Sequence, residues 1–258
     1  MGKVILHSQY NHFSEYITNN QEEATMELWN DGKIWEYIQH DYSKGSALLI
    51  EPRCLQNMTY ALVEKEYQRF DNIFTHDTQL LTTLPNAHQI LYWNEYEIHN
   101  EPKTKDISMI CGNKNMCNLH NLRQIIAERI HDNVDILGTW NGGRFCTKQE
   151  AYAPYRFAIV IENYIDDYWF TEKLLNAFSN RTIPIYFGAR KIHKYFNIDG
   201  IIQLNNLWDV FEVVNDIKYQ NPEAVYYKMH GPMEDNFQRV QKYKNFEDWF
   251  FKTYGGDI

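Results

Sequence analysis

Short, almost continuously apolar runs recur along the chain, and longer stretches of mixed polar and apolar residues separate them. Such runs are typical of β-strands that helices cover on both faces. The predicted strands are Val4–His7, Ala47–Glu51, Asn72–His76, Ile90–Trp93, Ile107–Cys111, Val134–Leu137, Phe157–Ile161, Ile183–Phe187 and Ile201–Leu204. The predicted helices are Leu122–His131, Glu172–Arg181, Trp208–Tyr219 and Pro222–Tyr243. Because strands and helices alternate, the sequence predicts an α/β fold with parallel sheets built from βαβ units.

A polar segment without periodicity, His99–Lys105, contains Pro102 and interrupts this pattern. We interpret it as the linker between two α/β domains, residues 1–103 and 104–258, with the C-terminal helices able to pack back on the first domain. Ligands of open parallel sheets bind beyond the carboxyl ends of the strands. Two facing sheets would therefore form an interdomain cleft at their junction.

Composition and charge narrow the class of protein. The chain has 258 residues, of which 44% are apolar, so it is neither disordered nor fibrous. Its net charge of −9 disfavours binding to duplex nucleic acid. Residues 1–103 carry 7 basic and 15 acidic side chains, so an anionic ligand meets less repulsion in the second half. The four cysteines match no zinc spacing, and the N-terminus does not resemble a signal peptide. We expect a soluble, cytoplasmic protein of microbial origin, or a viral protein in the host cytoplasm, without a transmembrane segment.

The densest group of candidate functional residues begins where a predicted strand ends, at Glu162 and Asn163, and Glu172 and Lys173 open a helix nine residues after Asn163. Thr171 can cap that helix. A strand end beside a helix start favours phosphate, because free backbone N–H groups and the helix dipole attract an anion. Lys173 adds a positive charge, Asn163 can donate and accept, and Glu172 can accept hydrogen bonds from sugar hydroxyls. The alternative is a charge pair at a helix N-terminus beside an ordinary surface asparagine.

Four segments in this region resemble the donor-binding block of glycosyltransferase family 10, the α-1,3/4-fucosyltransferases that use GDP-fucose. They are Phe157–Asn163, Asp167–Leu174, Ile183–Gly188 and Tyr195–Asn197. A weaker likeness extends to Ser108–Lys114, Leu122 with Arg123, Ala47–Pro52 and Phe70–Asp77. The resemblance covers the chain from about Gly45 onward.

This resemblance implies a GT-B architecture, in which two Rossmann-like halves bind the acceptor and the nucleotide sugar, and a single displacement that inverts the anomeric carbon. It assigns Arg123 and Lys173 to the diphosphate, and Asn163 and Glu172 to the sugar and ribose groups of the donor. Glu51 matches the general base of the family. The implied partners are a nucleotide sugar donor and a glycan acceptor.

Two departures from the family pattern concern the identity of the acceptor. Pro52 follows Glu51 directly, whereas the animal enzymes have a serine between these positions, and the first domain is short. Glu95, Glu97 and Glu101 are rival candidates for the base, since they lie near the predicted linker. Glu51 could instead pair with Arg53 in a loop, and Arg123 could be a solvated helix residue.

We expect no metal cofactor, because Lys173, Arg123 and a helix N-terminus can take up the charge of a leaving diphosphate. No D-x-D triplet is present. Asp166 and Asp167 are the alternative metal ligands, although acids before a helix N-terminus are equally suited to compensating its dipole. The sequence thus predicts a fucosyltransferase. The alternatives are a transferase for another GDP-linked sugar and a nucleotide- or glycan-binding module without turnover.

Overall fold

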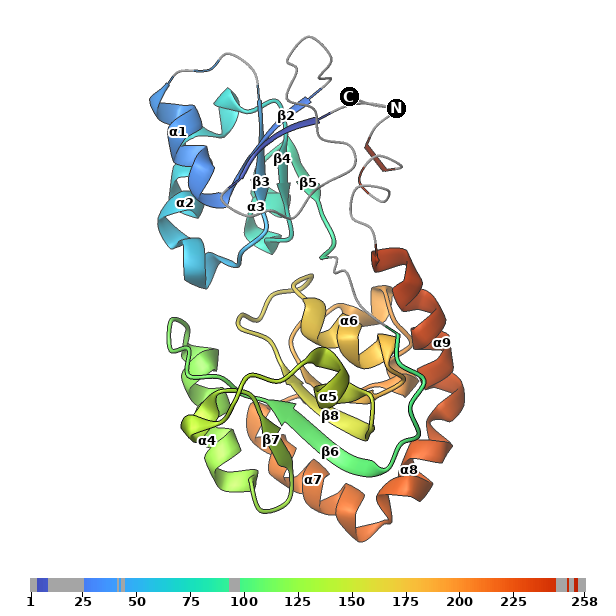
Figure 1. Cartoon of the computed structure of the whole chain (residues 1–258). Helices are drawn as coiled ribbons and strands as arrows, with labels where there is room; N and C mark the ends of the chain where they lie inside the picture. Colours follow the sequence, from blue (N-terminus) through green and yellow to red (C-terminus); the bar gives the residue numbers. More distant parts are fainter. Residues whose placement is uncertain are drawn as a thin grey trace. The chain divides into compact units, whose positions relative to one another are not determined.

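The computed structural model describes residues 4–8, 26–40, 42, 45–92, 98–244, 250, 253 and 254 (Figure 1). The chain forms two compact units. The first contains residues 1–92 and 245–258, and the second contains residues 93–244. Within the described residues, no helix is long and apolar enough to cross a lipid bilayer.

The described residues of the first unit include five parallel strands in the order β1-β2-β3-β4-β5. The strands are β1 (Val4–His7), β2 (Met26–Asn30), β3 (Ser46–Leu49), β4 (Ile73–Thr75) and β5 (Ala87–Gln89). The helices α1 (Ile34–Gln39), α2 (Arg53–Glu66) and α3 (Thr78–Thr83) connect β2 to β5. Right-handed crossovers that always advance in one direction leave their helices on the same face of a sheet. Accordingly, Tyr37, Val63 and Leu80 from the three helices belong to one buried core with Leu49 and Ile73.

Side chains from the end of the chain cover the opposite face of this first sheet. Phe74 points away from the helical core, because successive residues of a strand face opposite sides. It packs against Phe250 and Tyr254, with ring centroids 4.8 and 5.2 Å away. Phe74 and Phe250 are both buried. Thus the C-terminal residues complete the core of the N-terminal sheet.

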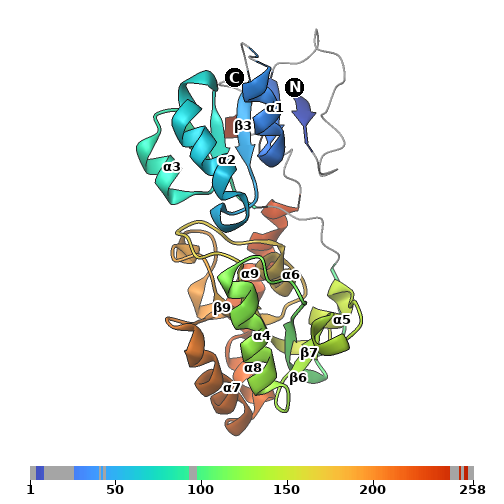
Figure 2. The ribbon, with the colours of Figure 1, turned by 90° about the vertical axis from the view of Figure 1, so that its left-hand side faces the viewer.

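The second unit, as described over residues 98–244, contains five parallel strands in the order β10-β9-β8-β6-β7. The strands are β6 (Lys105–Ile110), β7 (Asp135–Leu137), β8 (Tyr155–Ile161), β9 (Ile183–Phe187) and β10 (Ile202–Gln203). The helices are α4 (Asn118–Ile130), α5 (Lys148–Tyr152), α6 (Glu172–Ser179), α7 (Val210–Tyr219), α8 (Pro222–Lys228) and α9 (His230–Val240). Figure 2 shows α4 and α5 on opposite sides of β6 and β7, so helices cover both faces.

The order of these strands reverses between β6 and β8. From β6 the chain passes through α4 to β7, toward one edge of the sheet. From β8 it passes through α6 to β9, toward the opposite edge. Such a topological switch point opens a crevice beyond the carboxyl ends of the two strands, where open α/β sheets bind their ligands. In the first sheet, each described strand lies next to the strand that precedes it in the chain, so the order of the described strands contains no such reversal.

The predicted α/β class and the parallel sheets are confirmed. The strand expected at Ile90–Trp93 is wrong: β5 lies at Ala87–Gln89, and Trp93 is outside the described residues. Pro222–Tyr243 is not one helix but divides at Met229. Pro232 explains the division, because a proline clashes with the carbonyl four residues earlier and is tolerated only in the first turn of a helix. The strand β2 and the helices α1, α2, α3 and α5 were not predicted.

Lys103, in the segment read as a linker, is anchored in the second unit. Its Nζ atom donates to the carbonyl oxygens of Ala153 and Asn180, at 2.9 and 2.7 Å, and to the hydroxyl of Thr182 at 2.9 Å. These bonds fix the entry into β6 beside the amino end of β8.

Candidate functional site

Two of the residues singled out from the sequence meet at the switch point of the second sheet. Arg123 lies on α4, which follows β6, and Asn163 lies just beyond the end of β8. The Nη2 atom of Arg123 donates to the side-chain oxygen of Asn163 at 2.8 Å and to the carbonyl oxygen of Ile161 at 2.7 Å. Arg123 is therefore held at the strand end rather than solvated on its helix.

The guanidinium group of Arg123 also keeps an unused donor. Its Nε atom is buried and has no hydrogen-bond partner among the described residues. Burial lowers the pKa of Arg123, while the nearby Glu162 opposes that effect. A buried donor without a partner costs free energy. Binding of a ligand is therefore favoured if one of its anionic oxygens accepts a hydrogen bond from this group.

Glu162 has a role that we did not predict, although it stood beside Asn163 in the sequence cluster. Its side chain is fully buried and accepts two hydrogen bonds from Thr171, at 2.9 Å from the backbone nitrogen and 2.7 Å from the hydroxyl. Lys173 lies 3.6 Å from the same carboxylate. Glu162 thus ties the end of β8 to the first turn of α6. The sequence did contain a signal for this role, because Glu162 is an acid at the end of a predicted strand, nine residues before the capping Thr171.

Glu172 and Lys173 form an ion pair at the start of α6. The Nζ atom of Lys173 donates to Glu172 at 3.1 Å and to the hydroxyl of Thr171 at 2.9 Å. Burial would lower the pKa of Lys173, but Glu172 and Glu162 outweigh it and raise that pKa. Burial would likewise raise the pKa of Glu172, yet Lys173 above all lowers it to about 2. Both side chains are charged at neutral pH. The structure therefore brings together all four predicted donor-binding residues.

His120 is a second neighbour that sequence reasoning missed. It lies in the first turn of α4, where its Nδ1 atom accepts the backbone N–H of Cys117 at 3.2 Å. Burial first, then the charges of Arg123, Lys114 and Lys173, lowers the pKa of His120 to about 4. A neutral imidazole therefore stands among three cations.

Asp167, a rival metal ligand, lies 2.6 Å from the Nζ atom of Lys191. The backbone carbonyls of Asp166 and Asp167 accept from the nitrogens of Arg190 and Lys191 at 3.0 and 2.9 Å, which ties this loop to the segment after β9. In the described ranges, no three His, Cys, Asp or Glu side chains gather in a group that could hold a metal ion.

Glu51, the predicted base, belongs to the first unit. It follows Ile50 at the carboxyl end of β3 and precedes α2, and its backbone carbonyl accepts from the Tyr60 hydroxyl at 2.9 Å. The backbone nitrogens of Ile50 and Glu51 lie 3.1 and 3.4 Å from one oxygen of Asp31 and donate to it. Asp31 is fully buried and has a φ of 43°. Burial, with a smaller contribution from Glu51, raises the pKa of Asp31 to about 7. Nothing in the sequence pattern pointed to Asp31.

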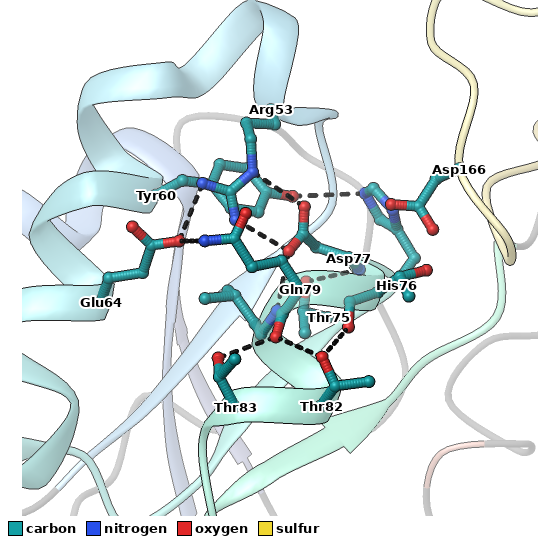
Figure 3. Close-up of polar contacts among 12 residues, drawn as sticks. Arg53, Tyr60, Glu64, Thr75, His76, Asp77, Gln79, Thr82, Thr83 and Asp166 are labelled. Atoms are coloured by element: carbon teal, nitrogen blue, oxygen red, sulfur yellow. Dashed lines mark hydrogen bonds and ion pairs between the residues drawn. The ribbon is translucent and has the colours of Figure 1, made fainter.

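Arg53, the suggested partner of Glu51, forms ion pairs with two other acids. Its guanidinium lies 2.8 Å from Asp77 and 2.9 Å from Glu64 (Figure 3). Glu101, a rival base, accepts a hydrogen bond from Gln149 in the second unit. Glu95 and Glu97 lie outside the described residues. The role of Glu51 stays a prediction.

Comparisons with known proteins agree on one family and one fold. Residues 100–252 match the model of glycosyltransferase family 10 (fucosyltransferase), C-terminal part. The α-(1,3)-fucosyltransferase FucT of Helicobacter pylori is 32% identical over 72 residues, which are 28% of this chain and only 15% of that protein.

Among solved structures, an α1,3-fucosyltransferase superposes with a TM-score of 0.57 at 17% identity, over 92% of this chain and 80% of the other. TarM superposes with a TM-score of 0.61 at 9% identity, over 89% of this chain and 54% of the other. At such identities the likeness concerns the fold, and the two parallel-sheet halves are those of the GT-B class.

Proposed function

Because the chain belongs to glycosyltransferase family 10, we propose that it transfers L-fucose from GDP-β-L-fucose to a hydroxyl group of a glycan acceptor, with inversion at the anomeric carbon. One observation carries this proposal. Arg123 on α4 gathers with the sequence-distant Asn163, Glu172 and Lys173 beyond the carboxyl ends of β6 and β8. This is where an open parallel sheet binds a nucleotide.

The cations of the site suit the diphosphate of the donor. When the bond to fucose breaks, negative charge grows on the leaving GDP and has to be stabilised. The buried Nε atom of Arg123 and the ammonium group of Lys173 are donors already held in place by Asn163, Thr171 and Glu172. Preorganised donors need no reorientation as the charge develops, so they can act without a metal ion.

The polar side chains of the site suit the sugar groups. Lys173 keeps Glu172 ionised, so its oxygens can only accept hydrogen bonds, as from hydroxyl groups of ribose or fucose. Asn163 contributes an amide, whose oxygen accepts from Arg123 at the end of β8.

Glu51 takes the proton of the acceptor hydroxyl in the proposed reaction. An alcohol is a poor nucleophile at neutral pH, so a carboxylate has to accept its proton as the new bond forms. Glu51 lies at a carboxyl strand edge, where Asp31 and Tyr60 hold its backbone. Pro52 restricts the backbone of Glu51 to extended conformations, which limits the movement of this residue.

The comparisons support fucose as the transferred sugar. The Helicobacter pylori relative is an α-(1,3)-fucosyltransferase. A solved α1,3-fucosyltransferase of similar fold was obtained with GDP-fucose, with a TM-score of 0.52 at 16% identity.

The test is turnover with a panel of oligosaccharides and either GDP-fucose or GDP-mannose. We expect GDP release and a fucose-sized mass gain on an acceptor with GDP-fucose alone. Transfer from GDP-mannose instead would assign a different donor. Binding of GDP-fucose without release of GDP, with or without acceptor, would leave a binding module and overturn the proposal.

A further inference from the structure

Side chains from two other segments of the first unit bind the backbone of Glu51. Its carbonyl oxygen accepts from the hydroxyl of Tyr60, which lies on α2, at 2.9 Å. Its backbone nitrogen donates at 3.4 Å to the Oδ1 atom of Asp31, in the connection that follows β2. The backbone nitrogen of Ile50 donates to the same oxygen at 3.1 Å. The chain is therefore held from two directions just beyond the end of β3.

The ring of Tyr60 is itself held in place. Tyr60 is fully buried, and the guanidinium of Arg53 lies over its ring, 4.7 Å from the centroid. Arg53 donates to both carboxylate oxygens of Asp77, at 2.8 and 3.0 Å (Figure 3). Asp77 in turn accepts from the backbone nitrogen of Leu80 in the first turn of α3, at 2.9 Å. Tyr60 thus offers its hydroxyl from a fixed position.

The hydroxyl of Tyr60 is a hydrogen-bond donor to Glu51 throughout the working range of pH. Burial above all, with Asp31 and Asp77 adding to it, raises the pKa of Tyr60 well above its ordinary value, so the phenol keeps its proton. A hydroxyl has one hydrogen to donate. The carbonyl oxygen of Glu51 lies 2.9 Å away, closer than the Nε2 atom of His76 at 3.4 Å, and receives this hydrogen.

A fixed backbone limits where the carboxylate of Glu51 can lie. When the peptide groups on both sides of its Cα atom are held, the side chain moves only by rotation about its own bonds. A general base has to lie within about 2.6–3.2 Å of the atom whose proton it takes. A displacement of about 1 Å can reduce the rate about 100-fold. Loosening the backbone should therefore slow proton transfer.

We propose that Tyr60 is a positioning residue, which together with Asp31 holds the backbone of Glu51 so that its carboxylate can meet the acceptor hydroxyl. This inference rests on the proposed function and adds to it a residue that governs the rate of transfer without contacting either substrate.

Tyr60→Phe tests the proposal, because it removes the hydroxyl and keeps the buried ring. We expect kcat for fucose transfer to fall about 10-fold, while KM for GDP-fucose stays within about 2-fold of wild type. Tyr37→Phe is the matched control, since Tyr37 is also fully buried and its hydroxyl donates to the carbonyl oxygen of Arg69 at 2.7 Å. Both variants should lose thermal stability, but only Tyr60→Phe should lose kcat. Equal kcat in the two variants would overturn the proposal.

A double variant shows whether Tyr60 acts through Glu51. In a Glu51→Gln background, Tyr60→Phe should slow transfer no further, because the two residues act through one carboxylate. A further loss as large as that of Tyr60→Phe alone would mean that the hydroxyl acts independently of Glu51, and this result would also overturn the proposal.

A measurement without ligand keeps this inference separate from the proposed function. A carbonyl carbon resonates further downfield when its oxygen accepts a hydrogen bond. Carbon-13 NMR should therefore show the carbonyl signal of Glu51 moving upfield in Tyr60→Phe and unchanged in Tyr37→Phe. An unmoved signal in Tyr60→Phe would overturn the proposal, whatever the protein transfers.

The two failures are distinguishable. If wild type transfers fucose, Glu51→Gln slows the transfer and Tyr60→Phe keeps the wild-type kcat, this inference alone is overturned. If wild type transfers no fucose while the carbonyl signal moves as expected, the proposed function fails and the hold of Tyr60 on Glu51 stands.

Discussion

The hydroxyl of Thr171 donates to the buried carboxylate of Glu162 at 2.7 Å and accepts from the Nζ atom of Lys173 at 2.9 Å. One hydroxyl thus connects the end of β8, the cap of α6 and the cation of the candidate site. Thr171→Ala removes the cap and leaves Glu162 one donor short. The free energy of unfolding should fall by roughly 2 kcal/mol. Urea denaturation measures the loss, and Thr171→Ser, which keeps the hydroxyl, should restore most of it.

Lys173→Ala should weaken GDP binding. The variant removes an ammonium group that is held toward the strand end, and a charge-assisted hydrogen bond is worth more than ~1.5 kcal/mol. Calorimetry should therefore show at least a ~10-fold loss of affinity. Lys218→Ala on α7 is the matched control, since it removes an exposed lysine of the same unit. Unchanged GDP affinity in Lys173→Ala would place the nucleotide elsewhere.

Glu51→Gln should slow transfer by roughly 10²–10⁴-fold, because the amide has nearly the shape of the carboxylate but cannot accept the proton. GDP affinity should barely change, since the proposed donor residues belong to the other sheet. The rate of fucose transfer at saturating acceptor is the measurement.

The rival bases provide the comparison for Glu51. Glu95→Gln, Glu97→Gln and Glu101→Gln should each retain transfer. If one of them loses transfer while Glu51→Gln keeps it, the base has been assigned to the wrong residue. Full activity in all four variants would mean that no single carboxylate among them acts as the base.

Transfer should proceed at an undiminished rate in excess EDTA. Lys173 and Arg123 offer positive charge and hydrogen-bond donors to the departing diphosphate. The measurement compares rates in EDTA with rates in added Mg²⁺ or Mn²⁺. Loss of activity in EDTA that either metal restores would return Asp166 and Asp167 to consideration as ligands.

Asp31 should make stability depend on pH. Burial above all, with Glu51 adding to it, raises the pKa of Asp31 from 3.8 to about 7. An acid whose pKa is higher in the folded state contributes stability that is complete below its unfolded pKa and lost as the pH rises through its folded pKa. The loss between pH 4 and pH 7 is roughly 4 kcal/mol.

Asp31→Asn cannot titrate and tolerates the positive φ of this position. Relative to wild type, its free energy of unfolding should rise by roughly 4 kcal/mol between pH 4 and pH 8. Denaturation curves at both pH values measure the difference. Asp132→Asn, at an exposed side chain, should show no comparable change. If the free energies of unfolding of Asp31→Asn and wild type differed by the same amount at both pH values, Asp31 would not titrate between pH 4 and pH 8.

The second unit was more predictable from the sequence than the first. The strands β8 and β9 are buried on both faces, so they are apolar almost throughout and easy to recognise. By contrast, β2 contains Glu27 and the buried Asn30, whose amide donates to the carbonyl of Leu48. The helix α2 buries only Thr59, Tyr60 and Val63, which make a weak apolar stripe.

The candidate site was predictable only in part, because some of its residues show local sequence signals and others depend on contacts between distant segments. The capping threonine and the helix start are local signals, which a sequence displays directly. The roles of Arg123 and Glu51 came from resemblance to the family. Asp31 and His120 were missed because groups near them, Ile50 for Asp31 and Lys173 for His120, are far away in the chain. Such contacts arise when strands become neighbours in the sheet, and residue type alone does not reveal them.

The packing of Phe250 and Tyr254 on Phe74 has a consequence for biosynthesis. Phe74 emerges from the ribosome early, whereas Phe250 follows the entire second unit. Chains generally fold domain by domain as they are made, but here Phe74 lacks its contacts with Phe250 and Tyr254 until the second unit has been synthesised. A nascent chain that stalls before Phe250 therefore leaves the Phe74 side chain of the first sheet without these two aromatic contacts, and such a side chain is a binding site for chaperones.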